Sequence, residues 1–281
     1  MPLTRASAII LGSIRLGEAN RLVTFLTPDR GRLSGMAYNA RRPNRRFGGA
    51  LELFTHSEMV MAERRPHHHI DLRQAAIIQG FPAVRVDLAR IEAASRLVML
   101  CRAFLPEAAP HPAAFELLAG ALSALNQGRS IWLTLRLFEI GLLRDVGYEP
   151  RLDRCVRCQR EWRQEQAGAL FFSPYGGGLL CRRCASIDAV AAQPLPILPG
   201  AAAFVRQAVR LGLDKGGRLH PSPRVCRDVD ALLRRYLHVL LDRQPFSERL
   251  DASWIGADSS QSPVSPMNIS SAGASFSTSN R

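Results

Sequence analysis

The sequence has almost no lysine, no long apolar run and none of several enzyme motifs. Lys215 is the one lysine among 37 basic side chains, and all the others are arginine. No apolar run approaches the roughly 18 residues that a membrane span needs, because even residues 132–146 include Arg136 and Glu139. The apolar run of residues 8–11 is too short for the core of a signal sequence. We therefore expect a cytoplasmic protein without a membrane partner.

Three catalytic signatures are missing or incomplete. No glycine-rich loop ends in Gly-Lys-Ser/Thr, which excludes a P-loop nucleotide site. Lys215 stands in Leu-Asp-Lys-Gly-Gly and not in the K-x-D-G order of adenylating ligases. His56-Ser57-Glu58 matches the H-x-E of nucleobase deaminases, but no proline precedes either cysteine pair of the chain. We expect that the protein is not an enzyme and has no small-molecule substrate.

The charge of the chain favours an anionic partner. The formal net charge is +13, which raises the concentration of polyanions near the surface. No acidic residue lies between Asp29 and Glu52. The stretch that these acids bound contains six arginines: Arg30, Arg32, Arg41, Arg42, Arg45 and Arg46. A solvated surface normally mixes both signs, so this stretch indicates an anion-binding edge.

Residues 1–80 have the pattern of a small β-barrel. Runs rich in Ile, Leu, Val, Thr and Phe predict strands at residues 7–15, 20–27, 32–39, 51–63 and 70–79. Pro28-Asp29-Arg30-Gly31 predicts a turn, since proline fixes φ and glycine tolerates a positive φ. Five short antiparallel strands suit an OB-fold, and an SH3-like barrel remains open.

Residues 81–250 change to helical periodicity, so the fold class is α+β. Apolar residues three and four apart predict helices around residues 91–105, 115–125, 200–213 and 224–242. Ser130 is the expected N-cap of a further helix that ends near Val146 and is buried. We expect an OB-fold domain at 1–80, a helical domain at 81–250 and a disordered, serine-rich tail at 251–281.

Two C-x-x-C pairs predict a metal centre within the helical domain, in a module at residues 150–186. The pairs are Cys155/Cys158 and Cys181/Cys184, and 22 residues separate them. Two such knuckles close a tetrahedron around Zn²⁺, which leaves no position for catalysis, so one structural zinc per chain is expected. Residues 168–180 have the pattern of a β-hairpin that delivers the second knuckle. Six nearby arginines either offset the charge of the tetrathiolate centre or add phosphate contacts: Arg151, Arg154, Arg157, Arg160, Arg182 and Arg183.

Both halves of the sequence resemble the bacterial RecO family. The matching residues are 17–27 (GEANRLVTFLT), Gly31-Arg32, Ala40-Arg41-Arg42, 47–52 (FGGALE), 147–150 (GYEP), 152–155 (LDRC), Phe172-Ser173-Pro174, Gly177-Gly178 and the closing Cys181-x-x-Cys184. The match runs from about residue 5 to 245. The serine-rich tail is outside this pattern, and arginine replaces lysine at several positions where relatives often have lysine.

The resemblance implies an OB-fold, a helical body with an inserted zinc module, and a role in recombinational DNA repair. A protein of this kind binds single- and double-stranded DNA, anneals complementary strands and helps load the recombinase onto strands coated by single-strand-binding protein. The implied partners are RecR and the acidic C-terminal tail of the single-strand-binding protein, and the implied location is the nucleoid in the cytoplasm. A zinc-containing adaptor that binds acidic proteins without annealing DNA remains the alternative.

An OB-fold holds single strands with a basic groove and stacking aromatic side chains. We expect five arginines to contact phosphates and two aromatic residues to stack on bases. These are Arg32, Arg41, Arg42, Arg45 and Arg46, with Tyr38 and Phe47. For Phe47, a position in the barrel core is equally favoured.

Overall fold

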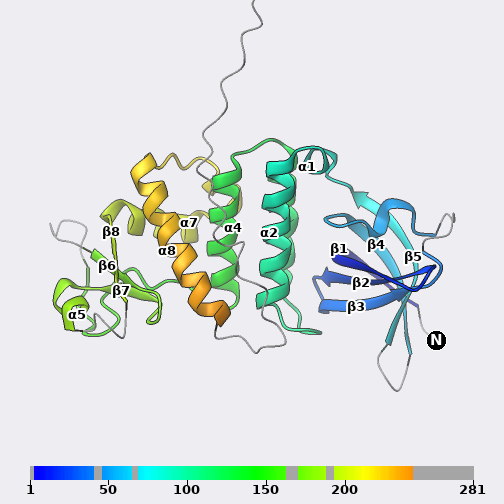
Figure 1. Ribbon diagram of the computed structural model, residues 1–281, viewed down its shortest axis with the longest axis horizontal. Coiled ribbons are helices and arrows are strands. Elements are labelled where there is room, and N and C mark those ends of the chain that lie inside the picture. Colours follow the sequence, from blue (N-terminus) through cyan, green and yellow to red (C-terminus); the bar gives the residue numbers. More distant parts are fainter. Residues whose placement is uncertain (1–2, 41–45, 65–68, 163–169, 188–192, 243–281) are drawn as a thin grey trace, which may run out of the picture.

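Five strands near the N-terminus form a closed barrel (Figure 1). All neighbouring strands are antiparallel except β3 and β5, which run parallel. The order around the barrel is β1 (Leu3–Leu16), β2 (Asn20–Thr27), β3 (Gly31–Ala37), β5 (His69–Gln79) and β4 (His56–Arg64). This order confirms the predicted five-stranded OB-fold and separates it from the SH3-like alternative.

The computed structural model describes residues 3–40, 46–64, 69–162, 170–187 and 193–242. The serine-rich segment 251–281, which we expect to be disordered, lies outside these residues. Across the described ranges, no helix is both long enough and apolar enough to cross a membrane.

Alternating side chains of the strands build the barrel core. In β3, buried and partly buried residues alternate along all seven positions, as expected when one face of a strand points inward. β4 begins at His56, five residues later than predicted, because Leu51 ends a short 3-10 helix, η1 (Gly48–Leu51), and residues 52–55 form a turn. Ala50 and Leu51 of η1 are buried in the barrel core, so η1 packs against the interior of the barrel and adds no strand to it.

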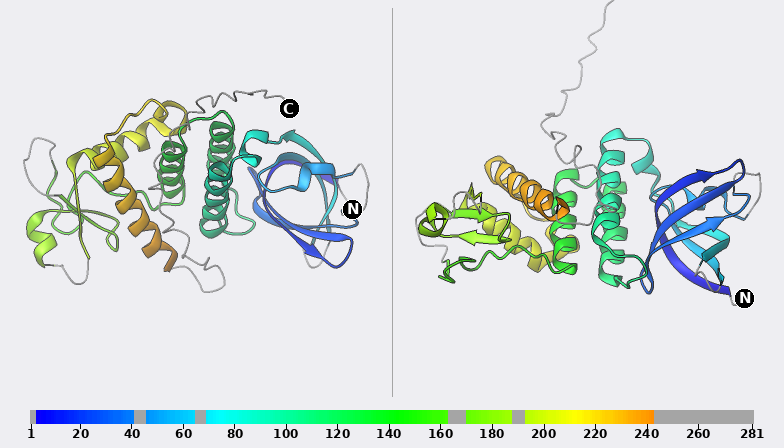
Figure 2. Two further views of the ribbon diagram at one scale, coloured as in Figure 1. Left: turned by 45° about the horizontal axis from the view of Figure 1, so that its top comes forward. Right: turned by 60° about the horizontal axis from the view of Figure 1, so that its bottom comes forward.

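Helices α1 to α4 follow the barrel and form the middle of the molecule (Figures 1 and 2). They are α1 (Pro82–Arg85), α2 (Leu88–Phe104), α3 (Pro112–Asn126) and α4 (Ile131–Asp145), and α7 (Pro199–Gly216) and α8 (Pro223–Asp242) complete the helical body. The Ser130 hydroxyl accepts a hydrogen bond from the Leu133 backbone N–H at 3.3 Å, which confirms the predicted N-cap of α4. α4 packs against α2, α3 and α7 and is the central, buried helix that the sequence predicted.

A network of buried charges connects three of these helices. Glu139 of α4 is fully buried and lies 2.7 Å from Arg96 of α2 and 2.6 Å from Arg136 of α4. Arg136 also lies 3.2 Å from Asp230 of α8, whose carboxylate accepts a hydrogen bond from the Trp132 indole at 2.8 Å. Burial raises the pKa of Asp230, while Arg136 and Trp132 act in the opposite direction. Because each charge has a partner, the network fixes how α2, α4 and α8 sit against one another.

The barrel is fastened to the helical body through the start of β3. The Arg32 guanidinium donates to the Leu105 carbonyl at 2.9 Å, and the Arg32 carbonyl accepts from the Ala108 backbone N–H at 2.8 Å. Gly31 has a φ of +71° and lies so close to this connection that an added Cβ would stand 1.7 Å from the Ala109 carbonyl oxygen. Only glycine tolerates both the positive φ and the close approach of the Ala109 carbonyl.

The cysteine-containing module lies at the opposite end of the long axis from the barrel (Figure 1). Its three-stranded sheet has the order β7 (Gly178–Leu180), β6 (Leu170–Ser173), β8 (Leu195–Ile197), and the short helix α5 (Arg182–Ile187) follows β7. Antiparallel pairing of β6 and β7 confirms the predicted hairpin between the two cysteine pairs.

Candidate metal centre and nucleic-acid interface

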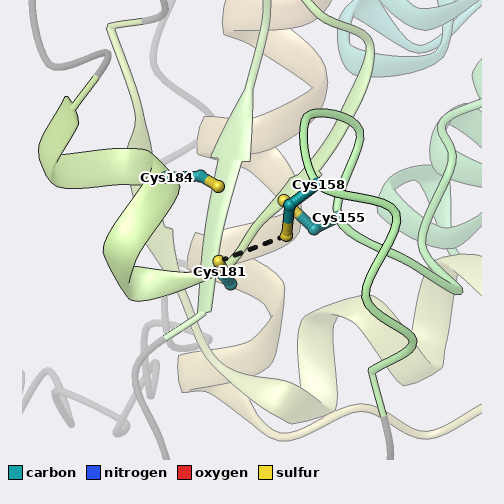
Figure 3. Close-up of side chains that lie close together, drawn as sticks. All are labelled: Cys155, Cys158, Cys181 and Cys184. Carbon is teal, nitrogen blue, oxygen red and sulfur yellow. Dashed lines mark hydrogen bonds between the residues drawn. The ribbon is translucent and has the colours of Figure 1, made fainter.

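Four cysteine side chains converge in this module (Figure 3). Their sulfur atoms all lie within 4.8 Å of one another, and the Cys158 and Cys181 sulfurs are 3.9 Å apart. Cys155 and Cys158 belong to a turn that the Gln159 N–H closes on the Cys155 carbonyl. Cys181 follows β7 and Cys184 lies in the first turn of α5, so the hairpin brings the second pair to the first.

The cluster fits a tetrahedral metal ion. Zinc–sulfur bonds of about 2.3 Å in a tetrahedron place the sulfurs about 3.8 Å apart, close to the separation of Cys158 and Cys181. Thiolates are also the ligands that zinc prefers at structural sites. The four cysteines predicted from their spacing therefore form one group that can hold a metal ion.

The thiols of the cluster influence one another strongly. Burial opposes ionisation of Cys155, but backbone N–H groups, including those of Cys158 and Cys181, outweigh it and lower the pKa to about 6. Burial and the sulfurs of the other three cysteines raise the pKa of Cys184 to about 12. Four thiols this close can ionise together only when a cation balances their charge.

Close backbone packing holds the first cysteine pair against the hairpin. The Val156 N–H donates to the Leu179 carbonyl at 2.8 Å, and the Leu179 N–H donates to the Arg151 carbonyl at 2.9 Å. A Cβ at Gly178 would stand 2.4 Å from the Val156 side chain and 2.7 Å from the Arg151 carbonyl oxygen. Glycine at this position therefore allows the first knuckle to approach β7 and complete the cluster.

At the other end of the molecule, the end of β3 away from the helices gathers several chain segments. The register places Ala37 beside Arg21 of β2, and Met36 beside Asp71 at the start of β5. The start of β2, the end of β3 and the start of β5 therefore lie together at one end of the barrel. OB-folds use the β1–β2 and β4–β5 loops and the face of strands 2 and 3 to bind oligonucleotides.

Two of the predicted DNA-contacting residues lie together at this barrel end. Tyr38 is exposed, with 42% of its surface accessible, and its carbonyl accepts a hydrogen bond from the Arg46 guanidinium at 2.9 Å. This contact brackets the segment that contains Arg41, Arg42 and Arg45, which lie outside the described residues.

Arg32 and Phe47 make contacts within the protein. Arg32 lies at the opposite end of β3 from Tyr38, where its guanidinium joins the barrel to the Leu105 carbonyl. Phe47 is 2% exposed and belongs to the barrel core, with the Arg46 guanidinium 5.3 Å above its ring. The core alternative that we considered for Phe47 is therefore the one observed, and its ring offers no open face to a base.

Sequence reasoning missed two arginines at the same barrel end. Arg15 and Arg21 face each other across the β1–β2 hairpin, and both lie beside the turn at Gly17. Arg21 is paired with Glu52 at 2.9 Å, whereas Arg15 is exposed. The sequence could have indicated this pair, because a hairpin with its turn at Gly17-Glu18-Ala19 places Arg15 and Arg21 opposite each other.

The H-x-E match belongs to the barrel and not to the metal cluster. His56 begins β4, lies 2.6 Å from the Ser7 hydroxyl and packs edge-on against Phe115. Burial lowers the pKa of His56, and Glu116 partly opposes the shift. The cysteine cluster is at the far end of the molecule (Figure 1), so the deaminase constellation does not form.

Comparisons with known proteins identify the family. The model described as "Recombination protein O N terminal" matches residues 1–81, and "Recombination protein O C terminal" matches residues 85–249. "DNA repair protein RecO" from Roseiflexus sp. (strain RS-1) is 38% identical over 249 residues, covering 86% of this chain and 83% of the relative.

Two further relatives have the same name. The protein from Anaeromyxobacter sp. (strain K) is 34% identical over 249 residues, which cover 89% of this chain and 96% of the relative. The protein from Pelotomaculum thermopropionicum is 32% identical over 243 residues, which cover 86% and 91%. With both family models matched in order and relatives aligned over most of their length, the chain belongs to the recombination protein O (RecO) family.

Proposed function

We propose that this protein is a non-enzymatic mediator of DNA repair and homologous recombination in the cytoplasm, associated with the nucleoid. It binds single- and double-stranded DNA, anneals complementary single strands and helps load the recombinase onto strands coated by single-strand-binding protein. The observation that supports the proposal is the barrel end, where the exposed residues Tyr38 and Arg46 lie together next to the end of β3 in an OB-fold.

The arginines of the barrel end hold the DNA backbone. Guanidinium groups neutralise phosphates whatever the base sequence, so binding is general and sensitive to salt. We assign phosphate contacts to Arg41, Arg42, Arg45 and Arg46, add Arg15 as a neighbour, and assign base stacking to Tyr38. Stacking on an aromatic ring tolerates every base, because each base has a π-face.

Annealing needs no catalytic group. Two single strands repel each other through their phosphates, and a bound protein that neutralises part of this charge lowers the barrier to their encounter. Base pairing then supplies the free energy of the product. This mechanism agrees with the missing nucleotide-binding and ligase motifs of the sequence.

The cysteine cluster serves as a structural zinc site in this proposal. Cys155, Cys158, Cys181 and Cys184 would hold the ion, and the ion would balance their negative charge and tie the hairpin to the first knuckle. Four protein ligands leave no open coordination position, so the site acts on the fold and not on the substrate.

The proposed protein partners are RecR and the acidic C-terminal tail of the single-strand-binding protein. Support for them comes from membership of the family and from the net charge of +13, which favours acidic partners. A protein that captures the acidic tail is brought to coated single strands, where annealing and loading take place.

Replacing Arg41, Arg42, Arg45 and Arg46 together with alanine tests the barrel end. We expect the affinity for labelled oligonucleotides to fall at least about tenfold for every sequence, and strand annealing to slow in parallel. Unchanged affinity at low salt would remove this end of the barrel from the proposal. An acidic peptide bound tightly by a protein that ignores both oligonucleotides and duplexes would instead favour the adaptor alternative.

A further inference from the structure

The end of the cysteine module is a second concentration of arginine, remote from the barrel. Arg157 lies between the first two cysteines, Arg160 follows them, and Arg182 and Arg183 lie between the second two. Because the four sulfurs lie within 4.8 Å of one another, both knuckles and their arginines share one tip. We call these four residues the module tip, and all four are exposed.

The charge of the module exceeds what the metal centre needs. Across the module, residues 150–186, the sequence has seven arginines and only three acids, Asp153, Glu161 and Glu165. A zinc ion with four thiolates carries a net charge of −2, which leaves two positive charges in excess. Asp153 forms an ion pair with Arg154 at 2.9 Å. Arg154 precedes the first knuckle and is not one of the four tip residues.

The hydrogen bonds that stabilise the Cys155 sulfur include several from the backbone. Backbone N–H groups of Arg157, Cys158 and Cys181 donate to the Cys155 sulfur. Within the described parts of the chain, no acidic side chain pairs with Arg160, Arg182 or Arg183. All three residues are exposed, which is what a surface for an external anion requires.

The shape of the tip favours a polynucleotide over a peptide. Peptide recognition needs a groove or pockets for side chains as well as charge. The large cleft of this region, about 690 Å³, lies between residues 149–153 and α7 and is lined by no residue of the tip. A phosphate backbone needs only several cations presented at the surface.

We propose that the module tip is a second binding surface for the phosphodiester backbone of DNA, separate from the barrel end. The inference rests on the proposed DNA-binding function and adds a second point of contact with DNA to that function. The two surfaces lie at opposite ends of the long axis, so one molecule holds two strands at once (Figure 1). Holding both strands raises the local concentration of one near the other, which is what annealing requires.

The test uses the full chain with R160Q, R182Q and R183Q combined. The matched control combines R218Q, R224Q and R227Q, which removes the same charge from exposed positions on α8 and the α7–α8 connection. Zinc content and thermal unfolding of both variants confirm that the fold is intact. The probes are two poly-dT oligonucleotides, one with a donor dye and one with an acceptor, which cannot pair with each other.

We expect the wild type and the control to bring the two oligonucleotides together and give energy transfer at equal protein and DNA concentrations. The tip variant should bind one oligonucleotide within about threefold of the wild type but lose roughly tenfold or more of the energy transfer, and the salt slope of any second binding event should fall by about 2. Sedimentation at the same concentrations identifies complexes that contain a single protein molecule.

Energy transfer in the tip variant equal to that in the control would overturn the inference, even with the barrel site intact. The inference would also be overturned if the wild type gave no energy transfer and only the fourfold barrel variant lost all DNA binding. If the barrel variant binds as tightly as the wild type and this binding depends on the tip, the result would support the tip and remove the barrel end from the proposed function. A protein whose tip binds an acidic peptide and that binds no DNA would overturn both the inference and the proposed function.

Discussion

Glu139 is the side chain on which the buried charge network depends. Its carboxylate balances Arg96 and Arg136, and none of its surface is accessible to solvent. We expect Glu139→Gln to lower the free energy of unfolding by about 3–5 kcal/mol, because two guanidinium groups then lack their shared counter-charge. Urea denaturation measures the change.

An exposed ion pair provides the comparison for Glu139. Glu149 lies 3.8 Å from Arg144, and both side chains are largely exposed. Glu149→Gln should change the free energy of unfolding by less than about 1 kcal/mol. Similar losses in the two variants would show that the internal network contributes no more than a surface pair.

His56 gives the stability of the protein a pH dependence of predictable sign. Burial lowers the pKa of His56 from its ordinary value of 6.5, so the unfolded chain binds a proton more readily than the folded chain. The contribution of neutral His56 is complete above pH 6.5 and is lost as the pH falls through the lower, folded pKa. Stability should therefore rise with pH over the interval just below pH 6.5.

His56→Gln removes the titrating ring and keeps a hydrogen-bonding group near Ser7. The free energy of unfolding of this variant should rise less steeply over the same pH interval. His220→Gln, at an exposed position, should leave the slope unchanged. Equal slopes in all three proteins would assign the pH dependence to other groups.

At the scale of elements, the turn between β2 and β3 decides how the barrel meets the helices. A Cβ at Gly31 would collide with the Ala109 carbonyl, and the residue also has a positive φ. Gly31→Ala should destabilise the protein by more than about 3 kcal/mol, since the connection must move as well as the turn. Thermal unfolding and limited proteolysis between the barrel and the helices measure this effect.

Gly17 is a control that separates the two effects of the Gly31 substitution, which are the strain of a positive φ and the collision with Ala109. It has a similar φ of +63°, but a Cβ there would meet nothing within 4 Å. Gly17→Ala should therefore cost only the backbone strain, about 1–2 kcal/mol. An equal effect at Gly31 would mean that the Ala109 contact does not constrain the docking.

The cysteine cluster determines the stability of the sheet and helix that it connects. The metal content should be one zinc per chain, and a chelator should melt β6–β8 and α5 while the barrel remains folded. Cys158→Ser should abolish zinc binding and destabilise the protein by a few kcal/mol, because the site then lacks a ligand. Metal analysis and circular dichroism give the two readouts.

Cys226→Ser is the matched control for the metal ligands. Cys226 lies in the first turn of α8, apart from the cluster, and its thiol lies 3.9 Å from the Pro221 carbonyl. Its replacement should leave the zinc content unchanged. A protein that keeps its zinc after Cys158→Ser would contradict the four-cysteine site.

Local patterns predicted those elements whose cause lies nearby in the sequence. Ser130 caps α4 through an N–H three residues away, and the strand β2 has the bounds that its apolar run predicts. The cysteine pairs were found because a knuckle is defined by its own spacing.

Other features depend on partners that are distant in the sequence. The role of Arg32 is set by a carbonyl 73 residues away, and no local pattern reveals it. Glu139 looked like a charge that interrupts an apolar helix, whereas its partners on α2 and α4 make it part of the core. The sequence left Phe47 equally open to base stacking and to the barrel core, and its burial next to η1 decides for the core.

At the scale of the whole molecule, the charge distribution predicts how binding responds to salt. If roughly 4–6 phosphates are neutralised on a single strand, the logarithm of the binding constant should fall with the logarithm of salt concentration with a slope of about −3 to −4. Fluorescence anisotropy at several salt concentrations measures the slope. A slope near zero would show that contacts other than phosphate neutralisation dominate.

The last helix has a consequence for synthesis of the chain. The barrel closes with strands that end at Gln79, so the ribosome releases all of its parts early. The helical body instead waits for α8, because Asp230 and the apolar face of that helix complete the packing around α4. A nascent chain stopped before residue 223 therefore has a finished N-terminal domain and a body that still exposes the surface α8 will cover.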